Sequence, residues 1–328
     1  MTIEFQRIAP GANLLDEDDV LPTLRLWRQQ GLRTVLVTLV GVEGGAPRQP
    51  GAQMAVAEDG RYVGYLSGGC LEQAVALEAQ DVAAKGINRL VRYGRGSPYF
   101  DIKLPCGSGL DLYFDQSLED AALQTVLDNR AARRATVLET DLDAGASAVS
   151  QLAGAVPLSC REGGVFKRVY PVPIRLALIG NGPAVSGIST LARHAGLDVI
   201  VWSSDDAIRA HLMALGVELK TGDIGLQDVI QTLDQASAAV LVFHDHDVEP
   251  AIAKQLLETP AFYLGILGNR AVHRARCEQL VAMGVEQTQI ERLHAPVGSI
   301  ANAKSKATFA FGVLTEMLSA ARACNLIS

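Results

Sequence analysis

Strands and helices alternate along the second half of the sequence, and this pattern constrains the fold more than any other feature. Four short apolar runs, each followed by a segment of helical periodicity, lie at 174–180, 197–202, 238–243 and 262–267. Consecutive parallel strands need a helical crossover, so this spacing predicts a parallel sheet with helices on both faces. We therefore expect a C-terminal Rossmann-like, doubly wound domain over residues 171–328.

The first half predicts a different, mixed α/β domain, which we expect over residues 1–170. Predicted strands lie at 34–40, 52–58, 61–67, 89–94 and 110–115, and predicted helices at 16–30 and 71–85. Asp59-Gly60 is a typical hairpin turn between two of these strands. After a predicted helix at 118–134, strands are expected at 135–140 and 164–170, while 141–154 is small and polar with no predicted element. Pro171 and Pro173 favour extended chain and mark the boundary.

Composition excludes several classes of protein. The chain has 29 basic and 36 acidic side chains in 328 residues, a net charge of -7, which argues against nucleic acid as a partner. Five cysteines in a chain of this length do not suggest a disulfide scaffold. No apolar run is long enough to cross a bilayer, and the acidic start does not resemble a signal peptide. We expect a cytoplasmic protein that binds no membrane.

Glycines crowd one part of the N-terminal half: eight of the 31 lie in residues 41–70. The loop after the first strand contains Arg48 among glycines and prolines, a setting that suits an oxyanion. Gly68 and Gly69 precede Cys70 at the start of a predicted helix, where the helix dipole favours a thiolate. Glycine-rich loops therefore present one arginine and one thiol.

Cys106 has a similar setting, because it is followed by Gly107 in a second glycine-rich loop. A lone cysteine is more often a small buried hydrophobe, but two thiols in such loops of one small domain favour a working role. Their separation, with no CxxC pair, argues against a standard zinc site. The other three cysteines, which lack such a setting and are interpreted as structural, are Cys160, Cys277 and Cys324.

The C-terminal half carries an incomplete dinucleotide fingerprint. Gly180 and Gly182 follow a predicted strand and open a helix, as a phosphate-binding turn requires. Val185 replaces the third glycine, and the acid expected after the second strand is absent, since Ser203 stands there. We expect no tight NAD(P) binding; a different phosphorylated ligand, or none, stays open.

Two further polar clusters follow later strands of the same predicted sheet. His244, Asp245, His246 and Asp247 come directly after the strand at 238–243, where doubly wound folds bind ligands. Neighbouring side chains of an extended chain point in opposite directions, so at most two could share a metal ion, and ligand contact or loop ordering is favoured. Arg270 after the next strand has two interpretations, a phosphate contact or a surface charge.

Several motifs together resemble one known family. EGGAPRQPGAQM, SGGCLEQAV, RYG, LPCGSGLDLYF, LALIGNGPA, FHDHD, LGILGNR and APVGSI follow in the order seen in the XdhC/CoxI family, over residues 34–115 and 174–318. This family matures xanthine dehydrogenases and related molybdenum hydroxylases. Where its members commonly have GAGHV, this chain has GNGPA, and the segment 301–304 also departs from the family pattern.

The resemblance implies a chaperone without turnover that binds molybdenum cofactor, with or without an added nucleotide. Such a protein supports sulfuration of the cofactor with a cysteine desulfurase, hands the cofactor to an apo-hydroxylase, and forms a homodimer. It also implies that Cys70 contacts molybdenum, that Cys106 is the family's second cysteine, and that the Arg48 loop holds the pterin phosphate. The alternative from another class is an NAD(P)-dependent oxidoreductase, which requires nicotinamide cofactor near Gly180 and Gly182.

Overall fold

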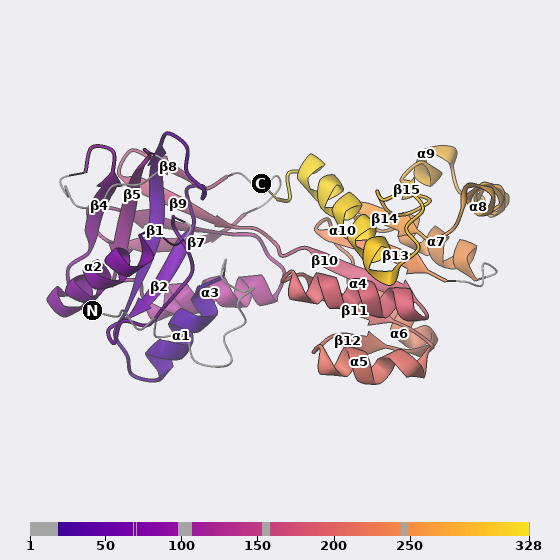
Figure 1. The fold of residues 1–328 in the computed structure, drawn as a ribbon, viewed down its shortest axis with the longest axis horizontal. Helices are drawn as coiled ribbons and strands as arrows, with labels where there is room; N and C mark the ends of the chain where they lie inside the picture. The colour runs from indigo at the N-terminus through magenta and orange to yellow at the C-terminus, as the bar shows by residue number, and fades with distance from the viewer. Residues whose placement is uncertain are drawn as a thin grey trace. The chain divides into compact units, whose positions relative to one another are not determined.

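The structure is a computed structural model that describes residues 19–67, 69, 71–97, 107–152, 158–243 and 248–327. The chain divides into two compact units, Met1–Val172 and Pro173–Ser328, here called the N-terminal and C-terminal units (Figure 1). Among the helices of the described ranges, none is long and apolar enough to cross a membrane.

A five-stranded antiparallel sheet forms the centre of the N-terminal unit. Its order is β3-β2-β1-β5-β4, with β1 (Thr34–Glu43), β2 (Gln53–Ala57), β3 (Tyr62–Val63), β4 (Arg89–Gly94) and β5 (Gly109–Asp115). The first seven residues of β1 are all buried, as expected for the middle strand of a sheet covered on both faces. Helix α2 (Glu72–Lys85) covers one face through Val75, Ala79 and Val82.

The other face of this sheet packs against α1 (Leu21–Gln29), α3 (Asp120–Ala131) and a second antiparallel sheet. That sheet has the order β7-β6-β9-β8, with β6 (Thr136–Asp141), β7 (Ser147–Gln151), β8 (Cys160–Glu162) and β9 (Val165–Tyr170). The sequence pattern gave no prediction for 141–154, where the structure contains β7. The side chains of β7 are mostly small, and all are exposed or half-buried, so pairing with β6 rather than β-propensity makes this edge segment a strand.

The C-terminal unit contains a six-stranded parallel sheet of order β12-β11-β10-β13-β14-β15. The strands are β10 (Arg175–Gly180), β11 (Asp198–Trp202), β12 (Glu218–Lys220), β13 (Ser237–Val242), β14 (Tyr263–Ile266) and β15 (Leu293–His294). The chain starts in the middle and winds outward in both directions, which is the dinucleotide-fold order and confirms the predicted fold class. The two outermost strands, β12 and β15, are too short for the sequence pattern to have shown them.

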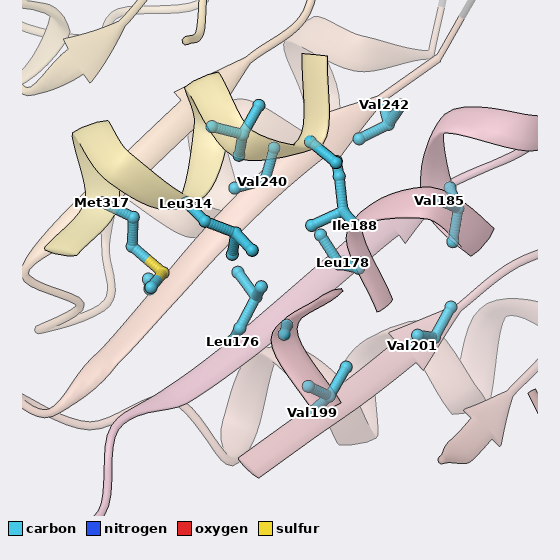
Figure 2. Close-up of a cluster of buried hydrophobic side chains, with 14 of the residues drawn as sticks. Leu176, Leu178, Val185, Ile188, Val199, Val201, Val240, Val242, Leu314 and Met317 are labelled. Carbon is cyan, nitrogen blue, oxygen red and sulfur yellow. The ribbon is translucent and has the colours of Figure 1, made fainter. Parts of the chain in front are cut away.

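Helices cover both faces of the parallel sheet because alternate strand residues point in opposite directions. Leu176 and Leu178 face α4 (Pro183–His194), α5 (Arg209–Ala214) and α10 (Lys306–Ala323), as Figure 2 shows for part of this core. Ala177 and Ile179 face α6 (Gly222–Gln231), α7 (Glu249–Leu257) and α8 (Arg270–Ala282). The short elements η1 (Asp206–Ile208) and α9 (Gln287–Ile290) complete the unit.

Candidate functional site

Three loops of the N-terminal unit open at the same end of its five-stranded sheet. Glu43, the last residue of β1, pairs with Gly109, the first residue of β5, and Gly109 also pairs with Gly94 at the end of β4. The loop 44–52 leaves β1 at this end, and the chain 95–108 joins β4 to β5 there. Strand β3 runs parallel to β1, since both pair antiparallel with β2, so Leu66 and Ser67, which follow β3, also lie toward this end. The strand pairing therefore directs the three predicted glycine-rich loops to one end of the five-stranded sheet.

The sequence-based site residues of this unit divide into two groups. Arg48, Gly69 and Gly107 are described, whereas Gly68, Cys70 and Cys106 lie outside the described residues. Gly69 has φ +106° and Gly107 φ +66°, both in the left-handed region, so glycine avoids backbone strain at these two positions. Arg48 is half-buried in its loop.

Backbone contacts fix the loop that carries Arg48. The N–H of Gly51 donates to the carbonyl oxygen of Leu39 at 2.7 Å, which closes the loop against β1. A Cβ on Gly51 would lie 2.6 Å from the Oγ of Ser159, and a Cβ on Gly44 would lie 3.7 Å from the Cα of Ser108. Glycine at position 51 thus lets this loop pack closely on the second sheet, whereas at Gly44 glycine is favoured by its φ of +81° rather than by lack of space.

Glu72, which the sequence analysis did not select, accepts hydrogen bonds from residues on both sides of the segment 68–70. Its carboxylate is buried and accepts hydrogen bonds from Leu66 N at 2.9 Å, Ser67 N at 2.8 Å and Leu71 N at 3.1 Å. Burial opposes ionisation, but these N–H groups outweigh it and hold the pKa of Glu72 below its usual value. The sequence analysis expected the helix dipole to favour a thiolate at Cys70, but it did not consider the negative charge of Glu72, the first residue of the same helix.

Arg92 is a second residue that sequence reasoning missed, and it joins three segments beside the Gly107 loop. Its guanidinium forms an ion pair with Glu43 and lies 3.1 Å from Asp111 Oδ1, and its Nε donates to the carbonyl oxygen of Arg95 at 2.8 Å. A Cβ on Gly109 would come within 2.6 Å of Arg92 Nη2. The glycine therefore makes room for the arginine.

A bulge in β1 contributes to this arrangement. Leu39 pairs with Leu112 of β5, but the next pair is Gly41 with Asp111, so β1 contains one extra residue, Val40. A Cβ on Gly41 would lie 2.7 Å from Asp111 Oδ2. The irregularity stands next to the strand end from which the Arg48 loop departs.

The two fingerprint glycines of the C-terminal unit lie where strand order reverses, between β10 and β13. A Cβ on Gly180 would lie only 2.0 Å from the carbonyl oxygen of Val242, and its φ is +152°. Gly182, with φ +83°, precedes α4. Val185, at the third fingerprint position, is fully buried in the core between strand and helix (Figure 2).

An acid does reach the turn that holds Gly180 and Gly182, although the sequence position after β11 holds Ser203. Asp205, two residues further on, accepts a hydrogen bond from Gly182 N at 3.2 Å. Ser203 Oγ donates to Asn181 Oδ1 at 2.8 Å and accepts from Asp205 N at 3.1 Å. The chain thus supplies its own carboxylate to the N–H group of the second glycine, and Pro183 removes another N–H from the first turn of α4.

The remaining predicted residues of this unit follow β13 and β14. Arg270 is exposed at the start of α8, which Asn269 caps by accepting from Ala271 N at 2.9 Å. His244, Asp245 and His246 lie outside the described residues. In the part of the chain that is described, no group of three or more His, Cys, Asp or Glu side chains could hold a metal ion.

Beneath this edge lies a buried ion pair, which the sequence analysis also missed. Arg276 of α8 donates from Nη2 to Glu249 Oε2 of α7 at 2.6 Å, and to the carbonyl oxygen of Leu267 at 3.0 Å. Arg276 is 2% exposed and Glu249 0%. The pair links two helices below the carboxyl ends of β13 and β14.

Comparison with known proteins places the chain in a family. The model of the XdhC and CoxI family matches residues 27–94, and that of the XdhC Rossmann domain matches 176–317. The molybdenum cofactor insertion chaperone PaoD of Escherichia coli is 33% identical over 292 residues, which cover 88% of this chain and 84% of PaoD. The chain belongs to the XdhC and CoxI family. The resemblance drawn from the sequence motifs is thereby confirmed.

Two other relatives of this XdhC and CoxI family member add information on fold and extent. A crystal structure from Bacillus halodurans, described as a xanthine dehydrogenase, matches with a TM-score of 0.74 at 22% identity and covers 92% of this chain and 96% of that one. At this identity the match establishes the shared fold. The uncharacterized protein YqeB of Escherichia coli is 26% identical over 88% of this chain but is covered over 44% of its own length.

Proposed function

We propose that this protein is a molybdenum-cofactor-binding chaperone that inserts the cofactor into a hydroxylase of the xanthine dehydrogenase and aldehyde oxidoreductase type. The supporting observation is that the loops of Arg48, Cys70 and Cys106 leave one end of a single sheet, in a homologue of a molybdenum cofactor insertion chaperone. The protein carries out no turnover, supports sulfuration of the cofactor together with a cysteine desulfurase, and acts as a cytoplasmic homodimer.

The proposed roles of the loops follow from their chemistry. Molybdenum prefers sulfur ligands, so the Cys70 thiolate contacts the metal of the bound cofactor, with Cys106 as the second thiol. The Arg48 guanidinium matches the oxygen geometry of the pterin phosphate, and N–H groups of the glycine turns at Gly68, Gly69 and Gly107 add donors. Cofactor binding is thus assigned chiefly to the domain 1–170.

The domain 171–328 supplies a second surface in this proposal. Gly180, Gly182 and Arg270, together with His244, Asp245 and His246, are proposed to contact the cofactor, at Gly180 and Gly182 through groups other than a pyrophosphate. Binding of NAD(P) is disfavoured, because a pyrophosphate needs N–H groups at the start of α4. There Gly182 N already donates to Asp205, and Pro183 has no N–H.

The molybdenum content of the purified protein and the activation of an apo-hydroxylase test the proposal together. Purified protein is mixed with molybdenum cofactor, passed through a desalting column and analysed for bound molybdenum, and then incubated with an apo-hydroxylase and a cysteine desulfurase. We expect stoichiometric binding by the wild type and by Cys324→Ala, whose thiol is exposed, and weaker binding and activation with Cys70→Ala and Cys106→Ala. Normal binding and activation by both loop variants would refute the site assignment.

A cheaper measurement addresses the oxidoreductase alternative. Trp202 ends β11 beside the fingerprint turn, and its Nε1 donates to the carbonyl oxygen of Gly222 at 2.8 Å. A nicotinamide cofactor bound at Gly180 and Gly182 would change the fluorescence of this tryptophan. We expect no response to millimolar NADH or NADPH; a saturable response would favour the oxidoreductase.

A further inference from the structure

The carboxylate of Glu72 ties together both ends of the turn that contains Cys70. On one side, Ser67 donates from its backbone N at 2.8 Å and from its Oγ at 3.0 Å. On the other side, Leu71 N donates to Glu72 Oε2 at 3.1 Å and to Ser67 Oγ at 3.0 Å. The one carboxylate therefore holds Ser67 and Leu71, the described residues that flank the segment 68–70.

Both oxygens of the carboxylate accept hydrogen bonds from backbone N–H groups, which makes the arrangement specific for an acid. Oε1 accepts from Leu66 N and Ser67 N, and Oε2 accepts from Leu71 N. A glutamine has one oxygen and one NH2 group, so it must turn a donor toward an N–H on one of the two sides. Its charge-free oxygen is also the weaker acceptor, since hydrogen bonds to ionised groups are roughly twice as strong.

Stability of the helix alone does not require this geometry. A carboxylate at the start of a helix already interacts favourably with the helix dipole when it is exposed. Glu72 is instead 2% exposed, and it binds the chain on both sides of residues 68–70. Burying a carboxylate is costly unless hydrogen bonds compensate, and here all the donors that compensate belong to this one turn.

We propose that Glu72 is a positioning residue that fixes the turn 67–71 so that the Cys70 thiol meets the molybdenum of the bound cofactor. This inference rests on the proposed function and extends it, because it assigns a role to a residue that does not itself touch the cofactor. The expected consequence is that the effect of Glu72 on affinity passes through Cys70.

A double-mutant cycle on cofactor affinity tests this role. Dissociation constants for molybdenum cofactor are measured for the wild type, Glu72→Gln, Cys70→Ala and the double variant, with unfolding by urea as a check on folding. We expect Glu72→Gln to weaken binding about tenfold, as the loss of one hydrogen bond to a charged group would. In the Cys70→Ala background the same change should have no further effect, because the thiol that it positions is gone.

Two further variants keep the test decisive. Glu78→Gln is the matched control, since Glu78 lies on the same helix and pairs with Arg89 rather than with the turn; its affinity should equal that of the wild type. Ser67→Ala removes only the hydroxyl between Glu72 and Leu71. If Glu72→Gln fails to fold, this milder variant should still weaken cofactor binding about threefold.

The outcomes separate the inference from the proposed function. Suppose that the wild type binds the cofactor and Cys70→Ala weakens this binding. If Glu72→Gln and Ser67→Ala then have no effect on affinity, or if Glu72→Gln weakens binding equally with and without the Cys70 thiol, the positioning role is overturned. The chaperone function is unaffected by either result. Absence of cofactor binding by the wild-type protein would instead overturn the proposed function and the inference with it.

Discussion

Replacement of Arg276 by methionine should destabilise the C-terminal unit strongly. The guanidinium is 2% exposed and its partner Glu249 0%, at a separation of 2.6 Å. Methionine fills much of the volume of the arginine stem but removes the positive charge and the hydrogen bond to Leu267 O. The Glu249 carboxylate then stays buried without its cation, which is the costly part of the change.

The expected magnitude follows from what the change leaves behind. Removing one partner of a buried ion pair costs about 3–5 kcal/mol, whereas replacing both partners by apolar residues is often nearly neutral. The double variant Glu249→Leu/Arg276→Met should therefore recover most of the stability lost in Arg276→Met. With a urea m-value of about 2 kcal/mol/M, the single change should lower the midpoint of unfolding by about 2 M.

Fluorescence can follow the C-terminal unit alone, because the chain has two tryptophans, one in each unit. In a Trp27→Phe background the signal comes from Trp202, so urea unfolding reports on the unit that contains Arg276. Arg274→Met is the matched control, since Arg274 is exposed on the same helix, and its effect should stay within about 0.5 kcal/mol. A loss below about 1 kcal/mol for Arg276→Met, or no recovery in the double variant, would refute the reasoning.

Two further predictions concern other buried contacts. Gly180→Ala should cost more than about 3 kcal/mol in the same urea assay, because its Cβ would lie 2.0 Å from the carbonyl oxygen of Val242. Gly284→Ala, also at positive φ but with open space around it, should cost only about 1–2 kcal/mol, and equal losses would contradict the steric argument. Tyr170→Phe should destabilise the N-terminal unit by about 1–2 kcal/mol, measured by tryptophan fluorescence in urea, because the buried Tyr170 hydroxyl donates to Gln53 Oε1 at 2.9 Å. An unchanged unfolding midpoint for Tyr170→Phe would show that the hydrogen bond contributes nothing.

The sequence pattern predicted the elements whose burial is continuous. β10 and β13 are apolar after their first residues, Arg175 and Ser237, and lie in the middle of the parallel sheet, so their residues carry the signal directly. β7 shows the opposite case, because its exposed serines and glutamine form a strand only through pairing with β6. Tertiary pairing of this kind leaves no periodicity that a single sequence could reveal.

The candidate site shows the same limit. Glycine crowding and the positions of Cys70 and Cys106 pointed to loops, since these are local features of the sequence. Arg92 was missed because its importance depends on partners that only the fold brings near, such as Glu43 from another strand. For Glu72 a signal was available, since an acid at the start of a helix next to a serine turn can accept backbone N–H groups.

The bulge in β1 has a consequence for how this strand tolerates insertions and deletions. Leu39 and the residues two and four positions before it face α2, and Val42 packs in the same core although it is three positions further along. The extra residue at Val40 therefore reverses the in-out alternation and turns Glu43 away from α2, toward Arg92. Without the bulge, regular alternation through Val40 would direct the Glu43 carboxylate at an apolar core and break its ion pair with Arg92, whereas deleting Val40 would leave Val42 and Glu43 on their present faces. The phase of a single strand thus decides whether this acid stabilises the loop end of the sheet or disrupts its interior.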